Sequence, residues 1–139
     1  METKGAVMFK GIEHIGILAR NSAALAKWYR ETLGWAVVLD NKETPPAFFL
    51  ATKDGSMVEI IPCKKAYAET TPTLSDPGLR HLAIAVDDFD KAYAVLQAKK
   101  VNFIEPPKAG AGGAKVVFFR DPEGNILHLI YRPTPLYKL

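Results

Sequence analysis

An internal repeat spans most of this sequence. Residues 11–17 (Gly-Ile-Glu-His-Ile-Gly-Ile) return 67 positions later as residues 78–84 (Gly-Leu-Arg-His-Leu-Ala-Ile). Each copy also ends in a similar segment, at residues 54–61 and at residues 123–130, which are 69 positions apart. A chain that repeats itself at this length is built from two copies of one supersecondary unit.

The hydrophobic pattern predicts the same order of elements in both copies: a strand, a helix and three strands. In the first copy, Asn21 and Ser22 offer an N-cap and Gly34 a stop for the helix. In the second copy, Asp87 or Asp88 offers the N-cap. The expected strands cover residues 12–19, 35–40, 47–51, 57–61, 79–86, 102–105, 115–120 and 125–131. The predicted fold class is α+β, with two βαβββ modules.

The length of 139 residues and the hydrophobic fraction of 48% suit one ordinary domain with a sizeable core. We therefore expect a single domain over residues 1–139. It would consist of a first module at about 11–62, a connector at 63–77, a second module at about 78–131 and a tail at 132–139.

Charge and composition argue against several classes of protein. The net charge of +3 comes from basic residues scattered along the chain, so no nucleic-acid role is expected. The start of the chain lacks the apolar run of a secretory signal, and no uninterrupted apolar segment is long enough to span a membrane, which predicts a cytoplasmic protein without a membrane partner. The single cysteine, Cys63, allows neither an internal disulfide nor a thiolate metal site within one chain.

Superposing the copies brings four metal-capable side chains to equivalent points: His14 on His81, and Glu59 on His128. The residue two positions after each first histidine is Gly16 or Ala83, which leaves space beside the imidazole. A lone histidine on an apolar strand is more often a core residue than a ligand, but four such residues at repeat-equivalent positions favour a metal site. Imidazoles and a carboxylate suit first-row divalent ions.

The double strand-helix-three-strand pattern resembles the vicinal oxygen chelate superfamily, also called the glyoxalase/bleomycin resistance/dioxygenase family. The similarity runs from about residue 11 to residue 131, and its most specific parts are residues 80–86 (Arg-His-Leu-Ala-Ile-Ala-Val) and 118–125 (Phe-Phe-Arg-Asp-Pro-Glu-Gly-Asn). The resemblance implies two curved mixed sheets that form an open cup around a divalent metal. It also implies a homodimer.

Within this resemblance, His14, Glu59 and His81 match the metal positions of glyoxalase I, whereas His128 replaces the usual second glutamate. The resemblance implies a metal-dependent lyase or isomerase that acts on a small α-oxygenated carbonyl substrate, with Ni, Zn, Mn or Fe as the metal. Glu59 and His128 are the candidate catalytic bases. With one carboxylate among the ligands, the site would carry a positive charge and prefer an anionic ligand.

Two other functions stay open. One is a metal-free small-molecule binding protein like the bleomycin-resistance proteins, and the other is an Fe(II) ring-cleaving dioxygenase. The candidate substrate-pocket residues are Phe49, Met57, Phe118 and Tyr131. The Gly-rich segment 108–113 is interpreted either as a mobile lid or as a plain flexible connection.

Overall fold

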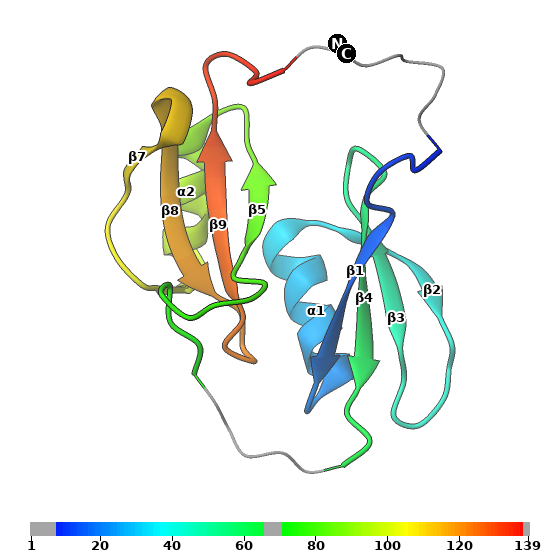
Figure 1. Ribbon diagram of the computed structural model, residues 1–139. Helices are drawn as coiled ribbons and strands as arrows, with labels where there is room; N and C mark the ends of the chain where they lie inside the picture. The colour runs from blue at the N-terminus through cyan, green and yellow to red at the C-terminus, as the bar shows by residue number, and fades with distance from the viewer. Residues whose placement is uncertain (1–7, 66–70, 138–139) are drawn as a thin grey trace. The chain divides into compact units, whose positions relative to one another are not determined.

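The computed structural model describes residues 8–65 and 71–137, and it divides into two compact units, Met1–Ala66 and Tyr67–Leu139 (Figure 1). Each unit contains one copy of the repeat. No helix in the described part of the chain has the length and apolar character needed to cross a membrane.

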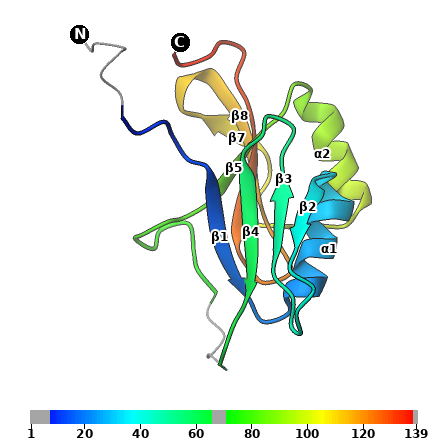
Figure 2. The ribbon, with the colours of Figure 1, turned by 90° about the vertical axis from the view of Figure 1, so that its right-hand side faces the viewer.

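Unit 1 follows the predicted order of elements. It consists of β1 (His14–Ala19), α1 (Ser22–Leu33), β2 (Ala36–Asp40), β3 (Phe48–Ala51) and β4 (Met57–Pro62). The strands lie in the order β1-β4-β3-β2, with β1 parallel to β4 and the other pairs antiparallel (Figure 2). Helix α1 packs on this sheet, and the side chains of Leu25, Tyr29, Leu50 and Ile60 are fully buried.

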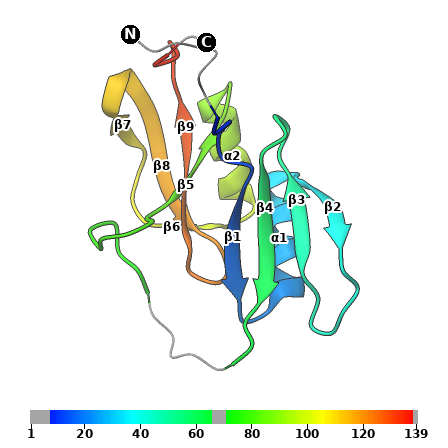
Figure 3. The ribbon, with the colours of Figure 1, turned by 45° about the vertical axis from the view of Figure 1, so that its right-hand side comes forward.

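Unit 2 repeats this plan with one addition. It consists of β5 (Leu82–Ala85), α2 (Phe89–Ala98), β6 (Asn102–Phe103), β7 (Lys108–Gly110), β8 (Ala114–Arg120) and β9 (Ile126–Tyr131). The strands lie in the order β5-β9-β8-β6, and β7 also pairs with β8 (Figure 3). Strand β7 and a 3₁₀ turn at Ala111–Gly113 occupy the Gly-rich segment for which we expected a lid or a flexible connection. Backbone pairing of β7 with β8 therefore orders part of that segment.

The helices begin where the sequence predicts. The Asn21 side chain accepts a hydrogen bond from the Ala24 N–H, and the Asp88 side chain accepts one from the Lys91 N–H. Both are N-caps that satisfy a free donor of the first helical turn. Helix α1 ends at Gly34, whose φ of 74° is in the left-handed region that glycine adopts without strain.

The strand register reproduces the repeat residue by residue. Gly16 lies opposite Glu59 in the parallel β1–β4 pair, and Ala83 lies opposite His128 in the parallel β5–β9 pair. The two open mixed sheets with few helices confirm the α+β class. The single domain with the predicted module limits, and the cup around a metal, stay predictions.

Candidate functional site

The first pair of candidate residues, His14 and Glu59, lies in unit 1. Because Gly16 is opposite Glu59, the side chains of His14 and Glu59 are diagonal neighbours on one face of the parallel pair. The distance from His14 Nε2 to Glu59 Oε1 is 3.4 Å. The other ring nitrogen, Nδ1, lies 2.5 Å from Glu13 Oε1. His14 is therefore held between two carboxylates, one of them from the residue just before it in the chain.

This first pair is open to solvent and has room beside it. The His14 side chain is 37% exposed and the Glu59 side chain 26%. A Cβ built on Gly16 would lie 4.0 Å from Glu59 Oε1, an ordinary contact distance, so the small residue leaves the carboxylate uncrowded. The Phe49 ring lies edge-on to His14 at 5.1 Å between centroids and forms an apolar side of the site.

The second pair, His81 and His128, lies in unit 2. His81 precedes β5 directly and His128 is in the middle of β9. Their ring centroids are 4.4 Å apart. Phe118 is paired with His128 across β8 and β9, and its ring lies 4.7 Å from His128 and 5.5 Å from His81. Phe118 is the repeat equivalent of Phe49, so each pair has a phenylalanine beside it.

The tautomer and the protonation state of the buried His128 ring follow from its hydrogen bond and its surroundings. Nδ1 lies 3.0 Å from the Leu129 carbonyl oxygen, which can only accept, so Nδ1 carries the hydrogen and Nε2 the lone pair. Burial is the main cause that lowers the pKa of His128. The charges of His81 and Arg132 lower this pKa further, and the bond to Leu129 opposes them. The unprotonated Nε2 can therefore accept a proton or bind a metal.

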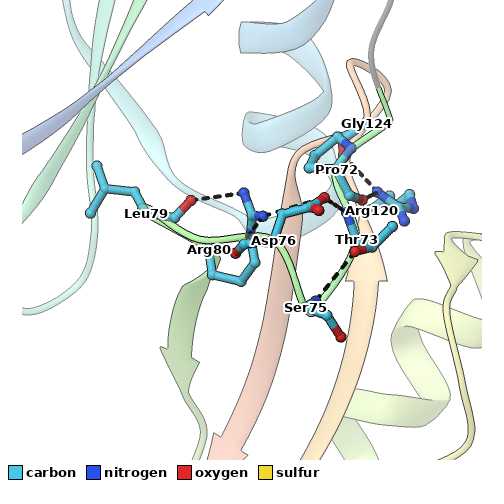
Figure 4. A network of polar contacts seen from close by, with 8 residues as sticks. All are labelled: Pro72, Thr73, Ser75, Asp76, Leu79, Arg80, Arg120 and Gly124. Carbon is cyan, nitrogen blue, oxygen red and sulfur yellow. Dashed lines mark hydrogen bonds and ion pairs between the residues drawn. The ribbon is translucent and has the colours of Figure 1, made fainter.

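A polar network fixes the chain just before His81 (Figure 4). Arg80 donates hydrogen bonds to the carbonyl oxygens of Asp76 and Leu79, and its guanidinium lies 3.7 Å from the Asp76 carboxylate. The same carboxylate accepts a 2.7 Å hydrogen bond from the Thr73 backbone N–H. These bonds close the segment on itself and set the position from which His81 enters β5.

Arg120 joins this segment to the β8–β9 turn. Its guanidinium donates to the carbonyl oxygens of Pro72 and Gly124, at 2.9 Å and 3.0 Å (Figure 4). The turn itself is closed by Asp121, whose carboxylate accepts from the backbone N–H of Glu123 and of Asn125. The turn that leads into β9, and so to His128, is thereby tied to the segment that leads to His81.

The structure thus brings the four predicted ligands together as two pairs, one in each unit. In the described ranges 8–65 and 71–137, no group of three or more His, Cys, Asp or Glu side chains is placed to hold a metal ion. Of the predicted pocket residues, Phe49 and Phe118 stand beside the pairs, and Met57 lies opposite His14 in the β1–β4 register. Strand alternation directs Tyr131 to the face of β9 opposite that of His128.

Sequence reasoning missed the residues that support the pairs. Glu13 is next to His14 in the sequence, so its adjacency was a usable signal. Arg80 and Arg120 bond to main-chain carbonyl groups, which every residue has, so no residue type in the sequence marks these contacts.

Comparison with known proteins agrees with this architecture. The model of the family described as "Glyoxalase/Bleomycin resistance protein/Dioxygenase superfamily" matches residues 11–129, so the chain belongs to this superfamily. The Metallothiol transferases FosB of Staphylococcus haemolyticus and of Staphylococcus epidermidis are each 29% identical over 127 residues, 88% of this chain and 84% of theirs.

Solved structures show the same fold. A glyoxalase family protein from Enterococcus faecalis superposes with a TM-score of 0.74 at 30% identity, over 89% of this chain and 99% of the other. A lactoylglutathione lyase from Agrobacterium tumefaciens superposes with a TM-score of 0.68 at 21% identity, over 90% and 96% of the two chains.

Proposed function

We propose that this protein is an enzyme that uses a divalent metal ion to act on a small molecule with two neighbouring oxygen atoms. His14, Glu59, His81 and His128 would bind the ion. The observation that carries the proposal is the state of His128: a buried, unprotonated imidazole whose Nε2 lone pair is oriented by the hydrogen bond at Nδ1. A histidine that binds a metal through one ring nitrogen usually donates a hydrogen bond through the other.

The donor set fits a first-row divalent ion of the Ni, Zn, Mn or Fe type. In unit 2 the ring centroids of His81 and His128 are 4.4 Å apart. In unit 1 the Glu59 carboxylate is 3.4 Å from His14 Nε2. Such an ion, when bound, would polarise the two substrate oxygens and stabilise negative charge that develops on them. The aromatic rings of Phe49 and Phe118 would keep water away from one side of each pair.

For the reaction itself we propose a lyase or isomerase step in which a carbon-bound proton is removed. Two groups are suited to accept that proton: the Glu59 carboxylate and the Nε2 atom of His128 where that atom is not a metal ligand. Incubation of the metal-loaded protein with α-hydroxy carbonyl compounds in D₂O tests the step, because proton removal is read by NMR as loss of the α-proton signal. Retention of every α-proton would contradict it.

A second candidate reaction is the transfer of a thiol to the substrate. It is favoured by the similarity to the Metallothiol transferases FosB over 88% of this chain. Enzyme-dependent loss of free thiol in the presence of metal and an α-hydroxy carbonyl compound, without exchange of the α-proton, would identify this reaction.

The metal site is tested first with purified protein that has been stripped of metal and then exposed to Ni²⁺, Zn²⁺, Mn²⁺ or Fe²⁺. We expect one ion per set of four side chains and loss of binding in His81→Ala. Absence of metal binding, together with small-molecule binding that His14→Ala and His81→Ala leave intact, would instead identify a metal-free binding protein.

We further propose a homodimer, as is common in this superfamily. Its size is measured by light scattering. Mixing the His14→Ala and His81→Ala variants then tests whether one chain or two supply the ligands. Restored metal binding at about a quarter of the sites would identify sites shared between two chains. No restoration would identify sites within one chain.

A further inference from the structure

The repeat places opposite charges before its two first histidines. Glu13 precedes His14, and 67 positions later Arg80 precedes His81. The Glu13 carboxylate lies 2.5 Å from His14 Nδ1, whereas the Arg80 guanidinium donates to main-chain carbonyl oxygens. A guanidinium has no acceptor atom, so position 80 cannot receive a hydrogen bond from an imidazole. A carboxylate at this position is thus particular to unit 1.

The two carboxylates beside the His14 ring lie at unequal distances from it. Glu13 Oε1 is 2.5 Å from Nδ1, and Glu59 Oε1 is 3.4 Å from Nε2. An N–H···O hydrogen bond is usually about 2.7–3.2 Å long, so only the contact at Nδ1 is short enough for one. Because a carboxylate can only accept, the single hydrogen of a neutral ring lies on Nδ1. Nε2 then carries the lone pair and faces Glu59.

The Nε2 atom and the Glu59 oxygen are spaced like two ligand atoms of one ion. With bonds of about 2.0–2.1 Å and tetrahedral angles, two ligand atoms of a zinc ion are about 3.3 Å apart. The distance between Nε2 and Glu59 Oε1 is 3.4 Å. Two acceptor atoms at this distance favour a cation between them.

The fold does not depend on the Glu13 side chain. This side chain is 75% exposed, and Glu13 lies just before β1. Its main-chain carbonyl accepts the Met57 N–H at the start of the β1–β4 pair, a bond that any residue at position 13 can make. A substitution that removes the carboxylate therefore leaves the strand pairing in place.

We propose that Glu13 is a positioning residue for the metal: its carboxylate holds the hydrogen of His14 on Nδ1 and thereby presents Nε2 to the ion. The inference rests on the proposed metal function. A metal-binding histidine usually donates its other N–H to a carboxylate or a carbonyl, which makes the binding nitrogen more basic. His128 has a carbonyl partner in this role, and Glu13 is the carboxylate counterpart in unit 1. Glu13 also brings a second negative charge near an ion that has one carboxylate ligand.

The first measurement reads the tautomer of His14 in metal-free protein. Protein with ¹⁵N-labelled histidine is studied by NMR at about pH 8, where a neutral imidazole is the main form. The chain has three histidines, and His14→Gln assigns the signals. We expect the hydrogen on Nδ1 in the original protein and in Glu13→Gln, whose amide oxygen still accepts. In Glu13→Ala it should move to Nε2, where Glu59 accepts it. The signals of His81 and His128 should not change.

The second measurement is Zn²⁺ affinity by calorimetry. Glu13→Ala should weaken Zn²⁺ binding by about tenfold, and Glu13→Gln should weaken it less, because the amide keeps the acceptor and removes only the charge. The matched control is Glu31→Ala. Glu31 is an exposed glutamate of helix α1 that contacts Arg30, so this variant loses the same charge and should bind Zn²⁺ like the original protein. Thermal unfolding of every variant separates loss of fold from loss of the contact.

The proposal is overturned where Glu13→Ala keeps the hydrogen on Nδ1 of His14, or where this variant binds Zn²⁺ as tightly as the original protein. An equal loss in Glu31→Ala would overturn it as well, because the effect would then come from net charge. Failure of the original protein to bind Zn²⁺ is a different result. It overturns the proposed metal function and with it the role of Glu13 toward the ion, and the ¹⁵N measurement still decides whether Glu13 sets the tautomer.

Discussion

The two units hold their candidate ligands in contrasting surroundings. In unit 1, His14 and Glu59 are a half-exposed pair of opposite chemical type, with a second carboxylate, that of Glu13, on the far side of the imidazole. In unit 2, the ring of His81 contacts that of His128, which is 5% exposed and hydrogen-bonded to the Leu129 carbonyl oxygen. The strand register around the two pairs is the same, so the difference comes from single side chains and from burial.

This contrast teaches that two copies of one fold can hold equivalent side chains in different surroundings. The unit 1 pair contains a carboxylate, and both of its side chains reach solvent. In unit 2, burial lowers the pKa of His128, and the hydrogen bond to Leu129 allows its neutral ring one tautomer.

The largest expected difference concerns metal affinity. Replacing the buried candidate ligand, with His128→Gln, should weaken Zn²⁺ or Ni²⁺ binding by about 100-fold. Replacing the exposed one, with Glu59→Gln, should weaken binding by about tenfold, because water can partly take its place. Calorimetric titration of both variants measures the difference. A greater loss with Glu59→Gln would reverse the assignment of the two roles.

Exchanging the residue types between the units tests the contrast in burial. In metal-free protein, His128→Glu should reduce the free energy of unfolding by about 1–3 kcal/mol, because it takes a carboxylate out of water at a buried position. Glu59→His, at a partly exposed position, should cost less than about 1 kcal/mol. Urea unfolding in the presence of a chelator compares them. Equal costs would show that the units do not differ in burial as described.

The helix caps should behave alike in the two units. Asn21→Ala and Asp88→Ala each remove a side-chain acceptor for one N–H of the first turn. Each should reduce the free energy of unfolding by about 1 kcal/mol. Denaturant titration of the two variants checks this symmetry, with the exposed Lys27→Ala and Lys91→Ala as controls within the same helices. If only one of the two variants lost stability, the two units would be equivalent in their strands but not in their helix caps.

His128 of unit 2 should make the stability of the protein depend on pH. The pKa of His128 in the folded protein is below its ordinary value of 6.5, so the unfolded chain binds the proton more readily. The contribution of His128 to stability is therefore complete above the ordinary pKa and is lost as the pH falls toward the lowered one. We expect His128→Gln to lose less stability than the original protein between about pH 8 and about pH 5. Parallel pH profiles from urea unfolding would contradict the burial of a neutral imidazole.

The smallest effect is expected where the units differ by one methyl group. A Cβ at Gly16 meets only ordinary contacts, the nearest at 3.7 Å from Ile61 Cδ1, and its equivalent in unit 2 is Ala83. Gly16→Ala should change the free energy of unfolding by less than about 0.5 kcal/mol. Thermal unfolding checks the stability, and metal titration of the same variant checks that the space beside His14 is sufficient.

Much of the fold could be predicted from the sequence because its signals are local. The caps Asn21 and Asp88 and the stop at Gly34 act over a few residues, and the structure confirms each of them together with the order of the strands and helices. Strand β7 was missed because Lys108–Gly110 has no apolar alternation. Its pairing with β8 comes from main-chain hydrogen bonds, which a side-chain pattern does not indicate.

For the candidate site, the sequence by itself determined which residues are equivalent. When the two copies of the unit are superposed, His14 takes the position of His81 and Glu59 takes the position of His128. Only the tertiary structure decided what each residue can do there. Burial favours the neutral form of His128, and the carbonyl group of the next residue, Leu129, selects its tautomer. The rings of His81 and Phe118 that contact His128 are distant from it in sequence and close in space, so its surroundings depend on packing rather than on residue order.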